Sequence, residues 1–272
     1  MTSSHLAKCL AIFSLGGWMT SAALAQDLVS EYQDVQTSQK QYEVKLGVGL
    51  QLSNKYPGAD KSILVPYPII VVDRLYVPGF GQVVDGVEKT RGWGVYPSFN
   101  FNGERKASDS LDLLGTNTID WSLEAGLGVR YRYDWLRGYA EFRQGFNGHT
   151  GQVGAFGLDI ITQPTEELEF VFGPRVDWGT QNYTDTYFGV TAPEAALNPL
   201  LTPFNAGSGL TSAGLQATAN YDINEDVTLH FRAGWDRYVG DAAKSPIVKA
   251  GSKDQFRIGA GVSYRFNFDV FE

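Results

Sequence analysis

The side chains best suited to catalysis in this sequence are two histidines and two serines. His149 lies in the segment NGHTG, and His230 lies in VTLHFRAGWD. A serine hydrolase needs a serine and a histidine held together, with a third group that orients the histidine. Ser122 and Ser263 are the candidate nucleophiles, but both fall on the polar face of an alternating segment, whereas a lipid substrate would reach the apolar face. We therefore expect no enzyme and no catalytic residues, and we interpret His230 as a hydrogen-bonded structural residue.

Acidic side chains offer a second kind of chemistry, as metal ligands or as paired carboxylates. Asp177, Asp185 and Glu194 lie in or beside one long segment, residues 179–209, that lacks a strand pattern. Their spacing does not match a calcium-binding loop. We therefore expect solvated carboxylates in this segment and no metal site.

Glycine pairs spaced as GxG are a third motif, at Gly47–Gly49 and Gly259–Gly261. A phosphate-binding loop requires a helix directly after the glycines. The sequence predicts strands at both places, where glycine permits bends and a close approach of neighbouring strands. No cofactor is expected, and the sequence identifies no partner-binding residue.

The first 25 residues predict a secretory signal peptide. His5 and Lys8 precede the apolar run LAIFSLGGW, and small residues follow up to Ala23-Leu24-Ala25. This order of charged, apolar and small residues is typical of an export signal, with cleavage expected before Gln26. The alternative, a membrane-spanning anchor, is disfavoured because the apolar run is too short for a bilayer core.

Cysteine usage and charge exclude several classes of protein. The only cysteine, Cys9, lies within the predicted signal peptide, so the mature chain has no disulfide, thiolate metal site or cysteine nucleophile. The formal net charge of -8 provides no basic patch for nucleic acid. Residues 26–40 are polar and aperiodic, which predicts a periplasmic linker before the folded part.

From Tyr42 onward, apolar and polar residues alternate with a period of two. Such alternation predicts strands with one apolar and one polar face. No segment has a convincing helical period, and the nearest, APEAALNPLL (192–201), is confined by prolines to a short turn of helix. The clearest alternating segments are 42–52, 119–133, 227–236 and 255–266, and weaker ones are 62–82, 91–102, 136–146, 151–162, 168–178 and 211–222.

The predicted fold is an all-β, transmembrane antiparallel β-barrel formed by residues 41–272. The segments match the length of outer-membrane strands, and aromatic residues such as Trp93, Trp121 and Tyr264 stand near segment ends, as in membrane-interface girdles. A soluble β-sandwich also alternates, with its apolar residues in a shared core. Strand length, aromatic placement and the export signal favour the barrel, with its apolar face toward lipid and its charges in the lumen.

Connection lengths support the same fold and give a strand count. Segments 133–135, 163–167 and 224–226 are tight turns, whereas 103–118, 179–209 and 239–253 are long. Short periplasmic turns and long external loops are typical of bacterial outer-membrane barrels. We predict ten strands, with 62–82 as one strand bent near Pro78-Gly79. Twelve strands, with another at 181–190, is the alternative.

The polar face carries about as many basic as acidic residues, often two positions apart. Unpaired charges in a narrow barrel would be costly, so these residues are expected to form ion pairs and hydrogen-bonded networks. The sequence therefore predicts a lumen largely filled by side chains, with at most a narrow path.

Three segments resemble a known family. GDAAKSPIV (240–248) followed by GSKDQFRIGAGVSYRF (251–266) is similar to the C-terminal signature of the MipA/OmpV family of outer-membrane proteins. TYFGV (186–190) resembles that family's middle motif, and IDWSLEAGLGVRY (119–131) its earlier glycine-rich strand. The likeness extends from Tyr42 to Phe266 and implies an integral outer-membrane barrel.

The resemblance also implies a role. The family's namesake bridges a lytic murein transglycosylase and a penicillin-binding protein in peptidoglycan synthesis and remodelling, whereas other members are adhesins, antigens or porin-like proteins. The resemblance to the family therefore predicts the fold of this chain better than its function. We expect a non-enzymatic scaffold in the bacterial outer membrane, in contact with outer-membrane lipid. A narrow porin-like channel for small solutes and a surface adhesin are the alternatives.

Overall fold

The structure, a computed structural model, describes residues 41–79, 81–85 and 91–270. The predicted signal peptide (1–25) and linker (26–40) lie outside the described residues. Among the residues described, no helix is both long and apolar enough to cross a membrane.

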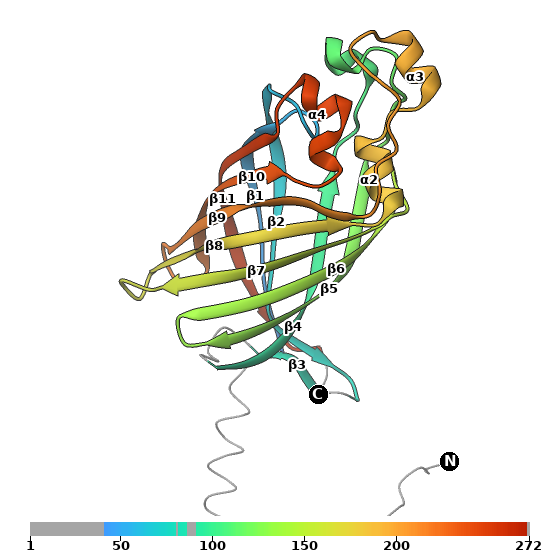
Figure 1. The fold of residues 1–272 in the computed structure, drawn as a ribbon. Coiled ribbons are helices and arrows are strands. Elements are labelled where there is room, and N and C mark those ends of the chain that lie inside the picture. The colour runs from blue at the N-terminus through green and yellow to red at the C-terminus, as the bar shows by residue number, and fades with distance from the viewer. Residues whose placement is uncertain (1–40, 80, 86–90, 271–272) are drawn as a thin grey trace, which may run out of the picture. The chain divides into compact units, whose positions relative to one another are not determined.

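The described chain forms a single antiparallel sheet that curls into an open barrel (Figure 1). The order of the strands in the sheet is β3-β2-β1-β11-β10-β9-β8-β7-β6-β5-β4, so the first and last long strands are neighbours and β3 and β4 are the edges. The strands are β1 (Tyr42–Asn54), β2 (Ser62–Val77), β3 (Gly81–Asp85), β4 (Arg91–Asn102), β5 (Ser122–Tyr133), β6 (Leu136–Asn147), β7 (Gln152–Thr162), β8 (Leu168–Gly179), β9 (Gly209–Asp222), β10 (Val227–Tyr238) and β11 (Asp254–Phe268).

The strand count differs from the predicted ten because the segment 62–82 reverses direction. At Pro78-Gly79 the chain turns back, with Gly79 at φ 86° and Gly81 at φ 80°, a backbone conformation that glycine adopts without strain. The five-residue strand β3 then pairs with the end of β2, Val77 opposite Gly81. The described residues therefore form eleven strands, of which all but β3 have eleven residues or more. The alternative of twelve is also wrong, because 181–188 is helical.

The two faces of the sheet are segregated as the alternation predicts. Leu46 and Val48 of β1 are exposed on the convex face, and so are their partners across the β1–β11 ladder, Tyr264 and Val262. Lys45, which alternates with them, lies on the concave face, where its amine donates to Thr228 of β10. The described strands belong to one curled sheet, so the β-sandwich alternative is wrong.

The two ends of the barrel are built differently. One end, the turn end, has short connections at 134–135, 163–167 and 223–226. The other carries four segments, 55–61, 103–121, 180–208 and 239–253, which together we call the cap. The helices gather at this end (Figure 1). They are the 3₁₀ turns η1 (Ala107–Asp109), η2 (Leu111–Leu113) and η3 (Ala242–Lys244) and the α-helices α2 (Gln181–Phe188), α3 (Ala192–Leu197) and α4 (Pro246–Ala250).

Candidate functional site

Among the described residues, the two hydrophobic core clusters lie in the cap. Because the concave face of the sheet is polar, the largest fully buried apolar side chains are found in the cap segments, led by Tyr187, Phe188, Leu113 and Ile247. They form two clusters of buried residues: Tyr56, Ala59, Leu113, Val190, Leu201 and Ile247 in one, and Ile119, Tyr187, Phe188, Ala206, Ala242 and Val248 in the other. Each cluster draws on at least three cap segments, so the segments fold as one unit.

The family-like segments meet at this core. Tyr187, Phe188 and Val190 belong to TYFGV, and Ile247 and Val248 belong to the segment 240–248. A buried hydrogen bond joins the two segments, from the Ser245 hydroxyl to the carbonyl of Phe188 at 2.7 Å. The third segment contributes Ile119 to the same cluster as Phe188. The three segments that resemble the family therefore share a structural purpose, which is to build the cap and fix it to the barrel.

Arg105 is a buried cation that ties two cap segments together. Its Nη1 donates to the carbonyl of Tyr187 at 2.9 Å, and its backbone N–H and C=O pair with Ile119. Burial lowers the pKa of Arg105, and the nearby carboxylate of Glu194 partly offsets that effect.

Glu194 is buried rather than solvated, with an exposed fraction of 8%. The expectation of solvated carboxylates is therefore wrong at this position. Its Oε1 accepts from the Asn117 N–H at 2.7 Å, and its Oε2 accepts from the N–H and hydroxyl of Thr191, each at 2.7 Å. Burial alone would raise the pKa of Glu194, but these hydrogen bonds outweigh it and hold the pKa below its usual range. Glu194 thus caps α3 and fastens that helix to the segment 103–121.

The three acidic candidates do not come together. Asp185 accepts from the Ala206 N–H at 3.2 Å within the cap. Asp177 lies inside β8, where it pairs with Arg175 at 3.0 Å and accepts from the Ser212 hydroxyl at 2.6 Å. Within the described ranges no group of three or more His, Cys, Asp and Glu residues is arranged to hold a metal ion.

Directly beneath the cap, Glu124 of β5 is the central acceptor of a buried polar network. Its carboxylate accepts from Asn102 at 2.8 Å and pairs with Arg143 at 3.2 Å. His149 Nε2 lies 3.4 Å from Glu124 Oε1, and the buried imidazole packs edge-on against Tyr187, with ring centroids 5.5 Å apart. The cap and the concave face of the sheet are therefore in direct contact at His149.

Neither serine candidate is placed as a free nucleophile. Ser122 is buried, and its hydroxyl bonds the Tyr187 hydroxyl at 2.9 Å, another link between barrel and cap. Ser263 does lie 2.7 Å from His230 Nε2, and Asn220 Oδ1 lies 2.9 Å from His230 Nδ1.

This Ser–His–Asn chain has the order of a catalytic triad but lacks its surroundings. Ser263 is buried in a central strand that is paired on both sides, with Gly47 and with Thr228. Backbone N–H groups in such a strand are committed to the ladders and supply no oxyanion hole. The arrangement therefore serves as a structural link across the concave face.

Most other charges of the concave face form ion pairs, as the sequence predicts, and the arginines Arg130 and Arg232 are exceptions. Most members of these pairs come from neighbouring strands or from positions two residues apart, whereas Lys45 of β1 and Asp222 of β9 are separated by two strands of the sheet. The pairs are Arg137–Asp159 at 2.7 Å, Arg265–Glu43 at 3.3 Å, Lys45–Asp222 at 3.8 Å, Arg143–Glu141 and Arg257–Asp236. Midway along the barrel these networks leave a polar cavity of about 290 Å³, which is lined by residues of β4 to β9.

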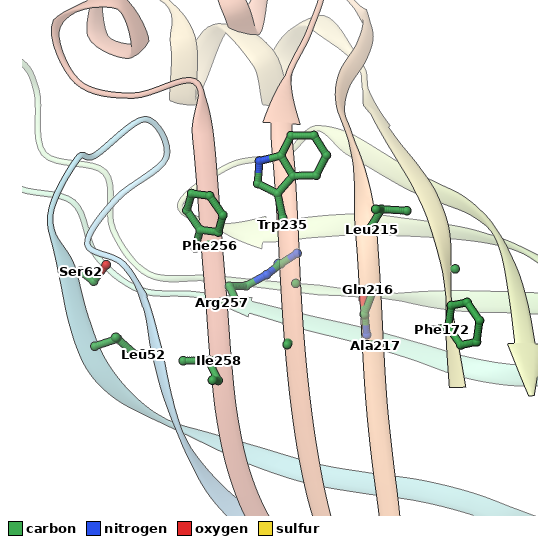
Figure 2. A pocket seen from close by; sticks show the side chains of 13 residues that line it. Leu52, Ser62, Phe172, Leu215, Gln216, Ala217, Trp235, Phe256, Arg257 and Ile258 are labelled. Carbon is green, nitrogen blue, oxygen red and sulfur yellow. The ribbon is translucent and has the colours of Figure 1, made fainter. Parts of the chain in front are cut away.

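A second, larger hollow lies over β8–β11, reaches Leu52 of β1 and Ser62 of β2, and has a mainly apolar lining. Its volume is about 560 Å³. Figure 2 shows side chains that line this groove, with Phe172, Trp235 and Phe256 among them. The short side chains of Ala217 and Ala233, paired across β9 and β10, leave the space that these larger residues surround. Such a lining offers few groups for catalysis and suits contact with hydrocarbon.

Sequence reasoning missed the packed cap. Tyr187, Phe188 and Val190 were the available signal, because three apolar side chains within four residues of a polar segment favour burial. Helix α2 carries Tyr187 and Phe188. It has only eight residues, which is too few for a helical apolar period to be recognised in the sequence.

A family model described as MltA-interacting protein MipA matches residues 46–266. No curated protein sequence matches the chain. Solved structures that are similar include Neisserial surface protein A (8% identity, 84% of this chain and 98% of that chain, TM-score 0.29) and OprG from Pseudomonas aeruginosa (10%, 84% and 98%, TM-score 0.27). Another is Ail, the attachment invasion locus protein of Yersinia pestis (9%, 83% and 99%, TM-score 0.26). Because these TM-scores are low, the fold is assigned from the strand pairing of this protein and not from the likeness to these structures.

Proposed function

Because this chain belongs to the MltA-interacting protein family, we propose that it is a non-enzymatic outer-membrane scaffold for peptidoglycan-remodelling enzymes. The observation that carries the proposal is a barrel filled from within. Ion pairs occupy the concave face, and a packed cap stands at one end. A general porin needs a wide wet channel, whereas this interior suits a rigid body that other proteins dock on.

The convex face supports membrane insertion. Val48 of β1, at 68% exposed, is one of many large apolar side chains on this face, with Leu127 and Phe231 among them. So much exposed apolar surface would be unfavourable in water. In a bilayer the same surface is stabilising, and every strand except the edges β3 and β4 is paired on both sides, so that its backbone hydrogen bonds are made within the sheet.

The turn end is the proposed docking face for a lytic murein transglycosylase. With the cap outside, the turn end faces the periplasm, where cell-wall enzymes act. It exposes the carboxylates Glu166, Glu167 and Glu225, none of which has an ion-pair partner among the described residues. This acidic rim is complementary to a basic patch on a partner, and such complementarity promotes association at low salt. A penicillin-binding protein would be a second partner of the same scaffold.

The test is retention of a purified lytic transglycosylase on the immobilised full chain in detergent. Glu166→Gln combined with Glu225→Gln should weaken retention and its salt dependence. The control combines Asp60→Asn with Glu104→Gln, two exposed carboxylates of the cap, and should bind as the unmodified chain does. Equal retention of the enzyme by both double variants would contradict the proposed docking face. No retention by the unmodified chain would contradict the scaffold role itself.

A second function, a narrow channel for small solutes, is favoured by one observation, the polar cavity midway along the barrel. Planar-bilayer recording separates the two proposals. The scaffold proposal expects no steady conductance, because the cap and the ion pairs obstruct the path. Regular open steps that grow when Phe188→Ala loosens the cap would support the channel instead.

A further inference from the structure

The polar cavity of about 290 Å³ is lined by residues of the six strands β4 to β9, and its lining has more basic than acidic side chains. Three arginines line it, Arg130 of β5, Arg137 of β6 and Arg175 of β8, against two carboxylates, Glu141 and Asp159. The cavity has room for a small solute, since a water molecule takes about 30 Å³ of liquid volume.

Both carboxylates are already committed. Asp159 accepts two hydrogen bonds from Arg137, from Nε at 2.9 Å and Nη2 at 2.7 Å. Glu141 pairs with Arg143 and accepts from the Tyr96 hydroxyl at 2.9 Å.

The cation of Arg175 is committed as well, to Asp177 at 3.0 Å. No lining carboxylate therefore remains for Arg130. The buried carboxylate of Asp73 on β2 interacts with Arg130 electrostatically but forms neither a hydrogen bond nor an ion pair with it.

Arg130 has neither a hydrogen bond nor an ion pair among the described residues. Its guanidinium lies 5.6 Å from the centre of the Tyr96 ring, a weak cation–π contact that leaves its N–H groups free. A half-buried guanidinium without partners is costly, because its charge is partly removed from water. Its planar fork of donors matches the two oxygens of a carboxylate or a phosphate.

We propose that this cavity binds a small soluble oxyanion, a carboxylate or a phosphate, on the guanidinium of Arg130. The hydroxyl of Tyr139, which lines the same cavity and makes no hydrogen bond within the described ranges, is a second donor for the ligand. The ligand would neutralise the surplus charge and join β5 to β6 inside the barrel.

The chain offers a matched control in Arg232 of β10. This arginine also has no carboxylate partner among the described residues, but its guanidinium lies 3.6 Å over the ring of Tyr67. It does not line the cavity. Replacing Arg232 removes the same charge from the same barrel, yet it leaves the proposed site intact.

The test is calorimetric titration of the folded full chain in a non-ionic detergent with sodium phosphate or sodium acetate, at constant ionic strength set with chloride. We expect saturable binding of at least one of the two anions to one site per chain. Arg130→Gln should weaken it about tenfold to a hundredfold, the loss expected for hydrogen bonds to a charged group. Arg232→Gln should leave affinity within about twofold, and Arg130→Lys should fall between, because lysine keeps the charge but loses the fork.

Three results would overturn the proposal. The first is no saturable binding of either anion, and the second is binding that survives Arg130→Gln unchanged. The third is an equal loss in the Arg130→Gln and Arg232→Gln variants, which would indicate bulk electrostatics rather than a site. Heat-dependent gel mobility of each variant verifies that the barrel is folded, so a misfolded variant is identified before titration.

Discussion

The barrel wall and the cap follow opposite rules for where apolar side chains lie. In the wall, Val48 and Ile258 point outward, while Lys45 and Glu124 lie inside. In the cap, Phe188 and Ile247 lie inside, as in a water-soluble protein. The difference indicates that one chain is adapted to two environments, with hydrocarbon around the wall and water around the cap.

Loosening the cap core should have the largest effect on the cap and little on the wall. Phe188→Ala removes a ring that is almost completely buried and packs against Tyr183 and Tyr238. Such truncations cost about 3–5 kcal/mol, so the cap should open locally. Limited trypsin digestion should then cleave at Lys249, while heat-dependent gel mobility reports an intact barrel. Loss of the folded barrel along with the cap would show that the two regions are a single cooperative unit.

A charge on the convex face should have the next largest effect. Leu50→Arg places a cation on the wall, where Leu50 is 54% exposed, and arginine facing lipid near the midplane costs about 2–4 kcal/mol. Leu200→Arg is the control in the cap, where the leucine is 61% exposed, and exposed substitutions in water lie within about 0.5 kcal/mol. Denaturant unfolding in lipid vesicles measures both. Equal, small effects would mean that the wall also faces water.

The smallest effect should come from acidification of the cap. Hydrogen bonds hold the pKa of Glu194 below its ordinary value of 4.5, so the folded cap binds a proton less readily than the unfolded segment. The contribution of Glu194 is therefore present above about pH 4.5 and is lost as the pH falls through the lowered pKa. As a helix-capping interaction it is worth about 1 kcal/mol.

Hydrogen exchange of residues 191–197 at neutral and acidic pH measures this contribution. Glu194→Gln should expose the segment at both pH values, and Glu225→Gln, at an exposed turn, should change neither. Protection of 191–197 that does not respond to pH in the unmodified chain would contradict the assignment.

The wall could be predicted from sequence because its signal is local. Alternation places Leu46 and Lys45 on opposite faces without reference to any distant residue. The predicted pairing of lumen charges is confirmed where the signal is equally local, as for Arg175 and Asp177, which are two residues apart on one strand. The predicted strand count is wrong because the chain reverses at Pro78-Gly79 instead of bending. A bend and a reversal use the same turn residues, and only the pairing of β3 with β2 distinguishes them.

The cap could not be predicted because its contacts join distant segments. Ser245 bonds Phe188, and Asn117 bonds Glu194, across 57 and 77 positions of the chain. The resemblance to the family identified the right segments without indicating that they pack together. The predicted absence of an active site remains a prediction, although Ser122 and Ser263 are both engaged in structural hydrogen bonds.

The most direct test of the two-solvent account is the surroundings of one label on each region. In the chain with Cys9→Ser, a nitroxide is attached at Val48→Cys in the wall, 68% exposed, or at Leu200→Cys in the cap, 61% exposed. The protein is reconstituted in vesicles and relaxation by oxygen and by a water-soluble nickel chelate is compared. We predict that the Val48 label is relaxed mainly by oxygen, which dissolves in hydrocarbon, and that the Leu200 label is relaxed mainly by nickel. Relaxation of the Val48 label mainly by nickel would contradict the account, because the convex face would then lie in water.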